Sequence, residues 1–165
     1  MGALTIVSPR TDADAQTGRQ LYEWIRARKP DALYNVTHER VTLRFSFSGE
    51  DDLTLGLDTM TAWNVRQLQR KPYPALYDSG TVYEREILCT HNGVTGICEE
   101  WWTTAQLLQR KSGDCEDLSC TLAAQYIVAG EKGARARAKR SSIGWHIQVR
   151  RADGTIEDPS KVLGM

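Results

Sequence analysis

One cysteine, one histidine and one aspartate in the last third of the chain have the types and the order of a nucleophilic site. Cys115 stands at the predicted first turn of a helix, where free N–H groups and the helix dipole favour a thiolate. His146 falls on a predicted strand, opposite the apolar side chains, and Asp158 falls on the next strand. Nucleophile, base and orienting carboxylate are the groups that cysteine-dependent acyl chemistry requires.

The elements that must position these residues follow from local patterns. Asp114 is predicted to cap a helix over 115–129, whose apolar residues gather on one side. Alternating apolar and polar residues predict strands at 134–140 and 144–151. A tight turn at 153–154 then leads to a short strand at 155–158, and pairing about this turn brings the carboxylate of Asp158 towards the imidazole.

The rest of the chain predicts elements that bear less directly on the chemistry. We expect helices at 12–29, 58–70 and 99–110, a half-buried strand at 39–48, turns at 49–52 and 91–93, an irregular segment at 73–80 and an extended segment at 81–88. A length of 165 residues without repeats or a linker predicts one domain over 1–165.

The residues around the three candidates resemble the motifs of transglutaminase-like cysteine proteins, which have a papain-like fold. The matching segments, in order, are Lys-Ser-Gly-Asp-Cys-Glu-Asp-Leu-Ser at 111–119, Gly-Trp-His-Ile-Gln-Val at 144–149 and Gly-Thr-Ile-Glu-Asp-Pro-Ser at 154–160. The resemblance implies an α+β fold in which a nucleophile helix packs on a small antiparallel sheet. It also implies catalytic roles for Cys115, His146 and Asp158.

The resemblance covers the region of about 99–160, which we take as the catalytic core, and leaves about 1–98 as an N-terminal elaboration. The segments 73–86 and 99–102 further resemble a subgroup of these proteins from bacteriophages and prophages. The family resemblance therefore suggests a phage-associated protein.

An oxyanion hole needs a second donor beside the backbone N–H of Cys115. Trp101, Trp102 and Gln106 are the candidates upstream of the nucleophile. A tryptophan there would resemble transglutaminases, and a glutamine would resemble papain-like peptidases. The alternative for the two tryptophans is that they pack against the nucleophile helix, as tryptophan near a core commonly does.

Acidic residues surround the predicted nucleophile. Asp114 is expected to cap the helix, and Asp117 is expected to bond nearby backbone or to help position the loop. Together with Glu116 they should raise the pKa of the Cys115 thiol, opposing the helix dipole. His146 is the group that can outweigh them.

The other cysteines and histidines have simpler interpretations. Cys89, Cys98 and Cys120 are expected to be core residues, and His38 and His91 to be structural or exposed. No Cys-x-x-Cys spacing occurs, so we expect no metal site and no cofactor.

The charge and the hydropathy of the chain limit the classes of partner that it is expected to bind. Lys+Arg and Asp+Glu both number 21, which gives no general affinity for nucleic acid. The basic residues of the last strands are expected to form a solvated face or to dock an acidic partner; they are Arg135, Arg137, Lys139, Arg140, Arg150 and Arg151. No apolar run suits a membrane span and the start lacks a secretory signal, so we expect a cytoplasmic protein at synthesis, with incorporation into a virion as the alternative.

Three functions agree with these observations. The first is a cysteine peptidase or amidase that acts on a peptide or protein through a thioester acyl-enzyme. The second is a transglutaminase, which passes the same acyl group to an amine. The third is a virion structural or assembly subunit that keeps a vestigial triad and binds other virion proteins.

Overall fold

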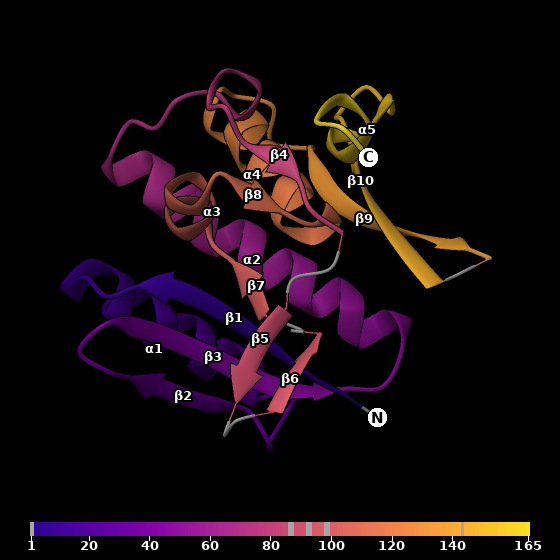
Figure 1. Ribbon diagram of the computed structural model, residues 1–165. Helices are drawn as coiled ribbons and strands as arrows, with labels where there is room; N and C mark the ends of the chain where they lie inside the picture. Colours follow the sequence, from indigo (N-terminus) through magenta and orange to yellow (C-terminus); the bar gives the residue numbers. More distant parts are fainter. Residues whose placement is uncertain (1, 86–87, 92–93, 98–99, 143) are drawn as a thin grey trace.

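The computed structural model describes residues 2–85, 88–91, 94–97, 100–142 and 144–165, and it describes side chains outside 86–99. The helices are α1 (Asp12–Arg26), α2 (Glu50–Arg70), η1 (Leu76–Asp78), α3 (Thr104–Arg110), α4 (Cys115–Val128) and α5 (Pro159–Val162). The strands are β1 (Gly2–Pro9), β2 (Leu33–Val36), β3 (Arg40–Phe47), β4 (Val82–Tyr83), β5 (Leu88–His91), β6 (Val94–Ile97), β7 (Glu100–Trp102), β8 (Ser112–Gly113), β9 (Arg135–Ser141), β10 (Gly144–Arg150) and β11 (Ile156–Glu157). The fold is α+β, as predicted (Figure 1).

The larger sheet has the strand order β2-β3-β1-β7. β1 is antiparallel to β3 and parallel to β7. The long helix α2 contacts α1 and β3 and also contacts α4 and β9, so it lies between this sheet and the C-terminal elements (Figure 1).

The smaller sheet carries the C-terminal candidates and has the order β11-β10-β9, with antiparallel pairing throughout. The nucleophile helix α4 packs against β10 and β9. Ile147 and Val149 of β10 and Leu118 and Ala123 of α4 are fully buried, so one apolar face of the sheet meets one side of the helix.

One cluster of buried side chains connects the two sheets. It includes Ile6 of β1, Phe45 of β3, Trp63 of α2, Leu118 of α4 and Ile147 of β10. Because β7 pairs with β1, the predicted catalytic core and the N-terminal elaboration also share a sheet. The site is therefore built on packing that involves the whole length of the chain.

The predicted turn at 49–52 is wrong, and the helix expected from 58 begins earlier. α2 starts at Glu50, and its first turn carries Glu50, Asp51 and Asp52. Carboxylates near a helix N-terminus are stabilised by the unpaired N–H groups and the dipole, which makes this acidic run a helix start. Leu53 and Leu57 are buried on the same helix, so burial of this additional segment stabilises it.

The helix predicted over 99–110 is wrong in its first part. Residues 100–102 form β7, where Trp101 pairs with Ile6 and Trp102 with Val7, and α3 begins only at Thr104. Both indole rings are buried. Pairing with a strand nearly a hundred residues earlier outweighs the helical spacing of the apolar residues.

Asp158 was predicted on a strand but lies just beyond one. β11 ends at Glu157, and Asp158 caps α5, where its side chain accepts a hydrogen bond from the backbone N–H of Lys161. The strands predicted at 39–48, 134–140 and 144–151 and the helices predicted at 12–29 and 115–129 are confirmed within a few residues. The sequence patterns do not predict β1, β2, β6, β8, η1 or α5, and the turn expected at 91–93 includes residues outside the described ranges.

Within the described ranges, none of the helices combines the length and the apolar character that a membrane span needs.

Candidate active site

The nucleophile candidate occupies the first residue of α4. Asp114 caps this helix, as predicted, and accepts a hydrogen bond from the backbone N–H of Asp117. Gly113 precedes the cap in a tight space, because a Cβ at that position would lie 2.4 Å from Cδ1 of Leu107. The Cys115 side chain is only 9% exposed, so its surroundings dominate its chemistry.

Two polar side chains of helix α4 lie near the backbone of one residue of strand β10, Ile147. The backbone N–H of Ile147 is close enough to the Cys115 thiol to lower its pKa. The Ser119 hydroxyl donates to the carbonyl oxygen of Ile147 at 3.1 Å. The nucleophile candidate is thus fixed against the residue that immediately follows His146 in the strand.

His146 and Asp158 form the predicted contact. Nε2 of His146 lies 2.8 Å from Oδ2 of Asp158, and Nε2 of Gln148 donates to the same oxygen at 3.1 Å. Burial acts to raise the pKa of Asp158, but the hydrogen bonds from His146 and Gln148 outweigh it and hold that pKa below its usual value. The ionised carboxylate therefore keeps the proton on Nε2 and leaves Nδ1 as the nitrogen that can accept one.

Strand β4 connects the segment before Cys115 with the segment after Asp158. It pairs in parallel with β8, and the backbone N–H of Glu84 donates to Gly113 O at 2.9 Å. On the other side, the backbone N–H of Tyr83 donates to Leu163 O, also at 2.9 Å. Burial and the nearby Cys115 raise the pKa of Tyr83, which places its hydroxyl in the electrostatic surroundings of the thiol.

Two tyrosines hold the residue before Asp158. Tyr77 and Tyr126 donate hydrogen bonds to the two carboxylate oxygens of Glu157 at 2.5 and 2.6 Å. Burial and this carboxylate raise the pKa of Tyr126 to about 12, so its hydroxyl stays protonated and keeps donating at neutral pH. The backbone that carries Asp158 is therefore tied to α4 and η1.

The thiol of Cys115 is in its protonated form in this arrangement. Its Sγ donates to Oε2 of Glu116 at 3.0 Å. Burial raises the pKa of the thiol most, the charge and hydrogen bond of Glu116 raise it further, and the N–H of Ile147 lowers it. The prediction that the acidic residues raise this pKa is confirmed.

The two predicted loop carboxylates serve the backbone. Asp117 is fully buried, and its Oδ1 accepts a hydrogen bond from the backbone N–H of Trp102 at 2.7 Å. Burial, together with the charges of neighbouring carboxylates, raises the pKa of both Asp114 and Asp117. The link from Asp117 to Trp102 joins the nucleophile helix to β7.

The three oxyanion candidates lie in different surroundings. The ring of Trp102 packs beneath the Arg110 guanidinium, whose carbon is 3.4 Å from the ring centroid. Gln106 is half-buried on α3. Trp101 lies on β7 and shares a cavity with Glu116, the residue that accepts a hydrogen bond from the Cys115 thiol.

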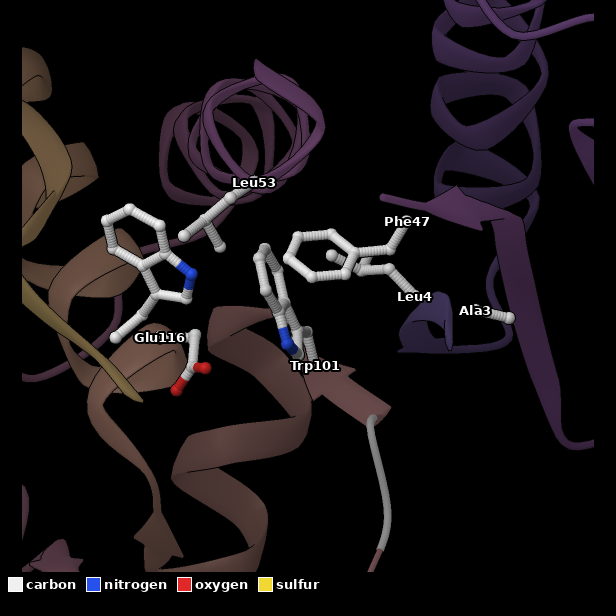
Figure 2. A pocket seen from close by; sticks show the side chains of 7 residues that line it. Ala3, Leu4, Phe47, Leu53, Trp101 and Glu116 are labelled. Atoms are coloured by element: carbon white, nitrogen blue, oxygen red, sulfur yellow. The ribbon is translucent and has the colours of Figure 1, made fainter. Parts of the chain in front are cut away.

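This cavity has a volume of about 270 Å³. Figure 2 shows Trp101, Leu53 and Phe47 as its walls, with the carboxylate of Glu116 at one side. Its lining residues are Ala3, Leu4, Phe47, Leu53, Trp101, Glu116 and Trp145. The cavity beside Glu116 is therefore lined mostly by apolar side chains, with a single carboxylate.

The sequence patterns missed several of these residues. The motifs assign no role to Ser119, Gln148, Tyr83 or the two tyrosines on Glu157, and only the alternation that places Gln148 on the same strand face as His146 could have indicated one.

The remaining cysteines and histidines lie away from this site where they are described. Cys120 is buried and its Sγ contacts the carbonyl of Leu57 in α2, which confirms it as a core residue. His38 is exposed. The side chains of Cys89, His91 and Cys98 lie outside the described residues. Among the side chains that the structure describes, no cluster of His, Cys, Asp and Glu suits a metal ion.

Comparison with known proteins gives no match: no family model, no curated protein and no solved structure is similar to this chain. The interpretation of the site therefore depends on the chemistry of its own residues.

Proposed function

We propose that the chain is a cysteine-dependent peptidase or amidase with a transglutaminase-like, papain-like core. One observation carries the proposal. Asp158 holds Nε2 of His146 at 2.8 Å on a strand whose next residue, Ile147, contacts the thiol of Cys115. In this proposal the nucleophile of α4 acts with the base and the orienting carboxylate, which are in contact with each other beside the same strand.

In the proposed reaction, Nδ1 of His146 takes the proton of the Cys115 thiol and the thiolate attacks the carbonyl carbon of an amide. The backbone N–H of Cys115 stabilises the oxyanion, with the indole N–H of Trp101 as the proposed second donor. His146 then gives its proton to the departing amine, which leaves a thioester on Cys115. Water attacks the thioester with His146 as base, releasing the acid and restoring the thiol.

Glu116 sets the resting state in this scheme. Its carboxylate accepts the thiol hydrogen, and its charge opposes ionisation of the sulfur. Proton transfer to His146 therefore requires the thiol to turn away from Glu116, which a substrate entering the adjacent cavity can bring about.

Two further candidates share the same residues. Transfer of the acyl group to an amine instead of water would make the chain a transglutaminase. The third candidate is a virion structural or assembly subunit with an unused triad, and the raised pKa of the Cys115 thiol agrees with a nucleophile that is not used.

Alkylation of the folded protein with iodoacetamide tests the proposal. For a working site, Cys115 reacts much faster than Cys120 near neutral pH, and His146→Gln removes that advantage. If Cys115 reacts no faster than Cys120 near neutral pH, and His146→Gln leaves its rate unchanged, the hydrolase proposal is wrong. A fluorogenic amide library then separates hydrolysis from transfer, since added primary amine diverts the product only in a transferase.

A further inference from the structure

The register of β9 and β10 places a row of cations beside the candidate base. In this antiparallel pair Lys139 lies directly opposite His146, Arg137 opposite Gln148, and Arg135 opposite Arg150. Directly opposite residues of paired strands point to the same face, about 5 Å apart. The four cations Arg135, Arg137, Lys139 and Arg150, here called the cationic row, therefore share the sheet face of His146 and Gln148.

The cationic row is exposed, whereas the other face of the same strands is buried. All four side chains are solvent-exposed, while Ala136, Ile147 and Val149, which alternate with them, are buried. Lys161 continues the positive charge past the end of the row, with its Nζ 3.6 Å from the carboxylate of Asp158.

The acidic side chains that could neutralise the cationic row are few, and most of them are already bound by other residues. The carboxylate of Asp158 is bound by His146 and Gln148. Glu157 is bound by two tyrosines and Glu131 by Arg151. Within the described residues, no ion pair involves Arg137, Lys139 or Arg150. The charge of Arg135 is near Asp58 of α2 and acts to lower the pKa of that carboxyl.

The arrangement also has a cost for the folded state. Arg135 and Arg150 are directly opposite each other, and like charges in that position destabilise a strand pair. An anionic ligand lying across the row would relieve this repulsion.

We propose that the cationic row binds an acidic segment of a polypeptide substrate, next to the amide bond presented to Cys115. This inference rests on the proposed function for the identity of the ligand as a polypeptide. The distance from His146 to Arg150 is four residues of strand, or about 13 Å, which matches about four residues of extended peptide.

A polypeptide fits better than nucleic acid. The chain as a whole has balanced charge, with 21 basic and 21 acidic residues, and the cationic row is short for a nucleic-acid backbone. The row begins beside His146, where the substrate of the proposed reaction must lie.

Fluorescence anisotropy with a labelled peptide tests the proposal. The probe is a fluorescein-labelled Gly-Glu-Glu-Ala-Glu-Glu-Gly peptide, compared with the same peptide carrying Gln at each Glu. Both are titrated with Cys115→Ser protein, so that binding is measured without turnover. The acidic peptide should bind more tightly than the Gln peptide, and added salt should weaken its binding.

Two charge-matched variants locate the binding. Arg137→Gln with Lys139→Gln should raise the Kd of the acidic peptide about five- to tenfold. Arg19→Gln with Arg44→Gln removes the same charge from exposed positions on α1 and β3, and should change the Kd less than about twofold. Circular dichroism verifies that both variants are folded.

The results separate this proposal from the hydrolase proposal. The role of the cationic row would be overturned by any of three results. The two peptides could bind equally, the two double variants could show equal Kd for the acidic peptide, or a labelled oligothymidylate could bind more tightly than the acidic peptide. If the peptide binds through the row but Cys115 proves unreactive, the row is a docking surface for an acidic polypeptide and the hydrolase proposal fails alone.

Discussion

Ser119 donates a hydrogen bond to the carbonyl of Ile147, 3.1 Å away, and it lies one helical turn after Cys115, whose thiol pKa is lowered by the N–H of the same residue. Positions 115 and 119 face the same side of α4, because residues four apart on a helix are neighbours. One side of α4 thus faces the backbone of one residue of β10. The Ser119 hydrogen bond stabilises the register of α4 against β10, and with it the position of Cys115 relative to this strand.

Ser119→Ala should lower both stability and the reactivity of Cys115. The substitution leaves the carbonyl of Ile147 buried without this partner, which costs about 1–3 kcal/mol. Urea unfolding measures that cost, and Ser142→Ala, at an exposed position after β9, should change stability by less than about 0.5 kcal/mol. Equal stability of the two variants would show that the Ser119 contact does not hold the helix.

Glu116→Gln should make the thiol of Cys115 more acidic. The carboxylate raises the thiol pKa both by charge and by hydrogen bonding, so its removal lowers that pKa and speeds alkylation at neutral pH. The pH dependence of iodoacetamide modification measures the shift. Glu23→Gln, at an exposed position on α1, serves as the control and should leave the profile in place. An unchanged profile in Glu116→Gln would contradict the role of Glu116 in the resting state.

Gly113→Ala should destabilise the loop before Cys115. The new Cβ would lie 2.4 Å from Leu107 Cδ1 and 3.0 Å from Asp117 Cβ, an overpacking that costs about 1–3 kcal/mol. Gly49→Ala is the matched control, because a Cβ there meets nothing within 4 Å, and its cost should stay below about 1 kcal/mol. Thermal unfolding compares the two, and a cost for Gly113→Ala no larger than for Gly49→Ala would show that the loop has room to adjust.

The Asp158 carboxylate should contribute to acid sensitivity. The pKa of this carboxyl in the folded protein lies below its ordinary value of about 3.9. The carboxylate therefore stabilises the folded state above pH ~3.9, and this stabilisation is lost as the pH falls through the folded-state pKa. Asp158→Asn should therefore be less stable than wild type at pH 6 and approach it at low pH. Urea unfolding at several pH values measures this convergence. The control variant Asp51→Asn changes an exposed residue, and its free energy of unfolding should change with pH as that of the wild type does. A constant difference between Asp158→Asn and wild type would contradict the assignment.

The sequence predicted the parts of the site that depend on local patterns. The helix after Asp114 and the strand that carries His146 follow from periods of 3.6 and 2 residues. The turn at 153–154 determined which residues of β10 and β11 pair, so the contact between His146 and Asp158 could be predicted as well.

Contacts between distant segments could not be predicted in this way. The pairing of β1 with β7 places Trp101 and Trp102 on a strand, although their own neighbours have a helical pattern. Tyr77 lies 80 residues before Glu157, and nothing in either local sequence indicates that they meet. Such contacts depend on the packing of the complete chain, and they supply most of the residues around the three predicted ones.

Strand β9 is the edge of its sheet, and this position gives its charges a second consequence. An edge strand offers unpaired backbone groups on which another chain can add a strand, and lysine and arginine at such an edge oppose this association. The alternation Arg-Ala-Arg-Ala-Lys-Arg from 135 to 140 therefore protects the molecule against self-assembly while it leaves the charges available to a ligand. Any neutralisation of this strand, by substitution or by a bound acidic chain, also makes the edge open to strand addition.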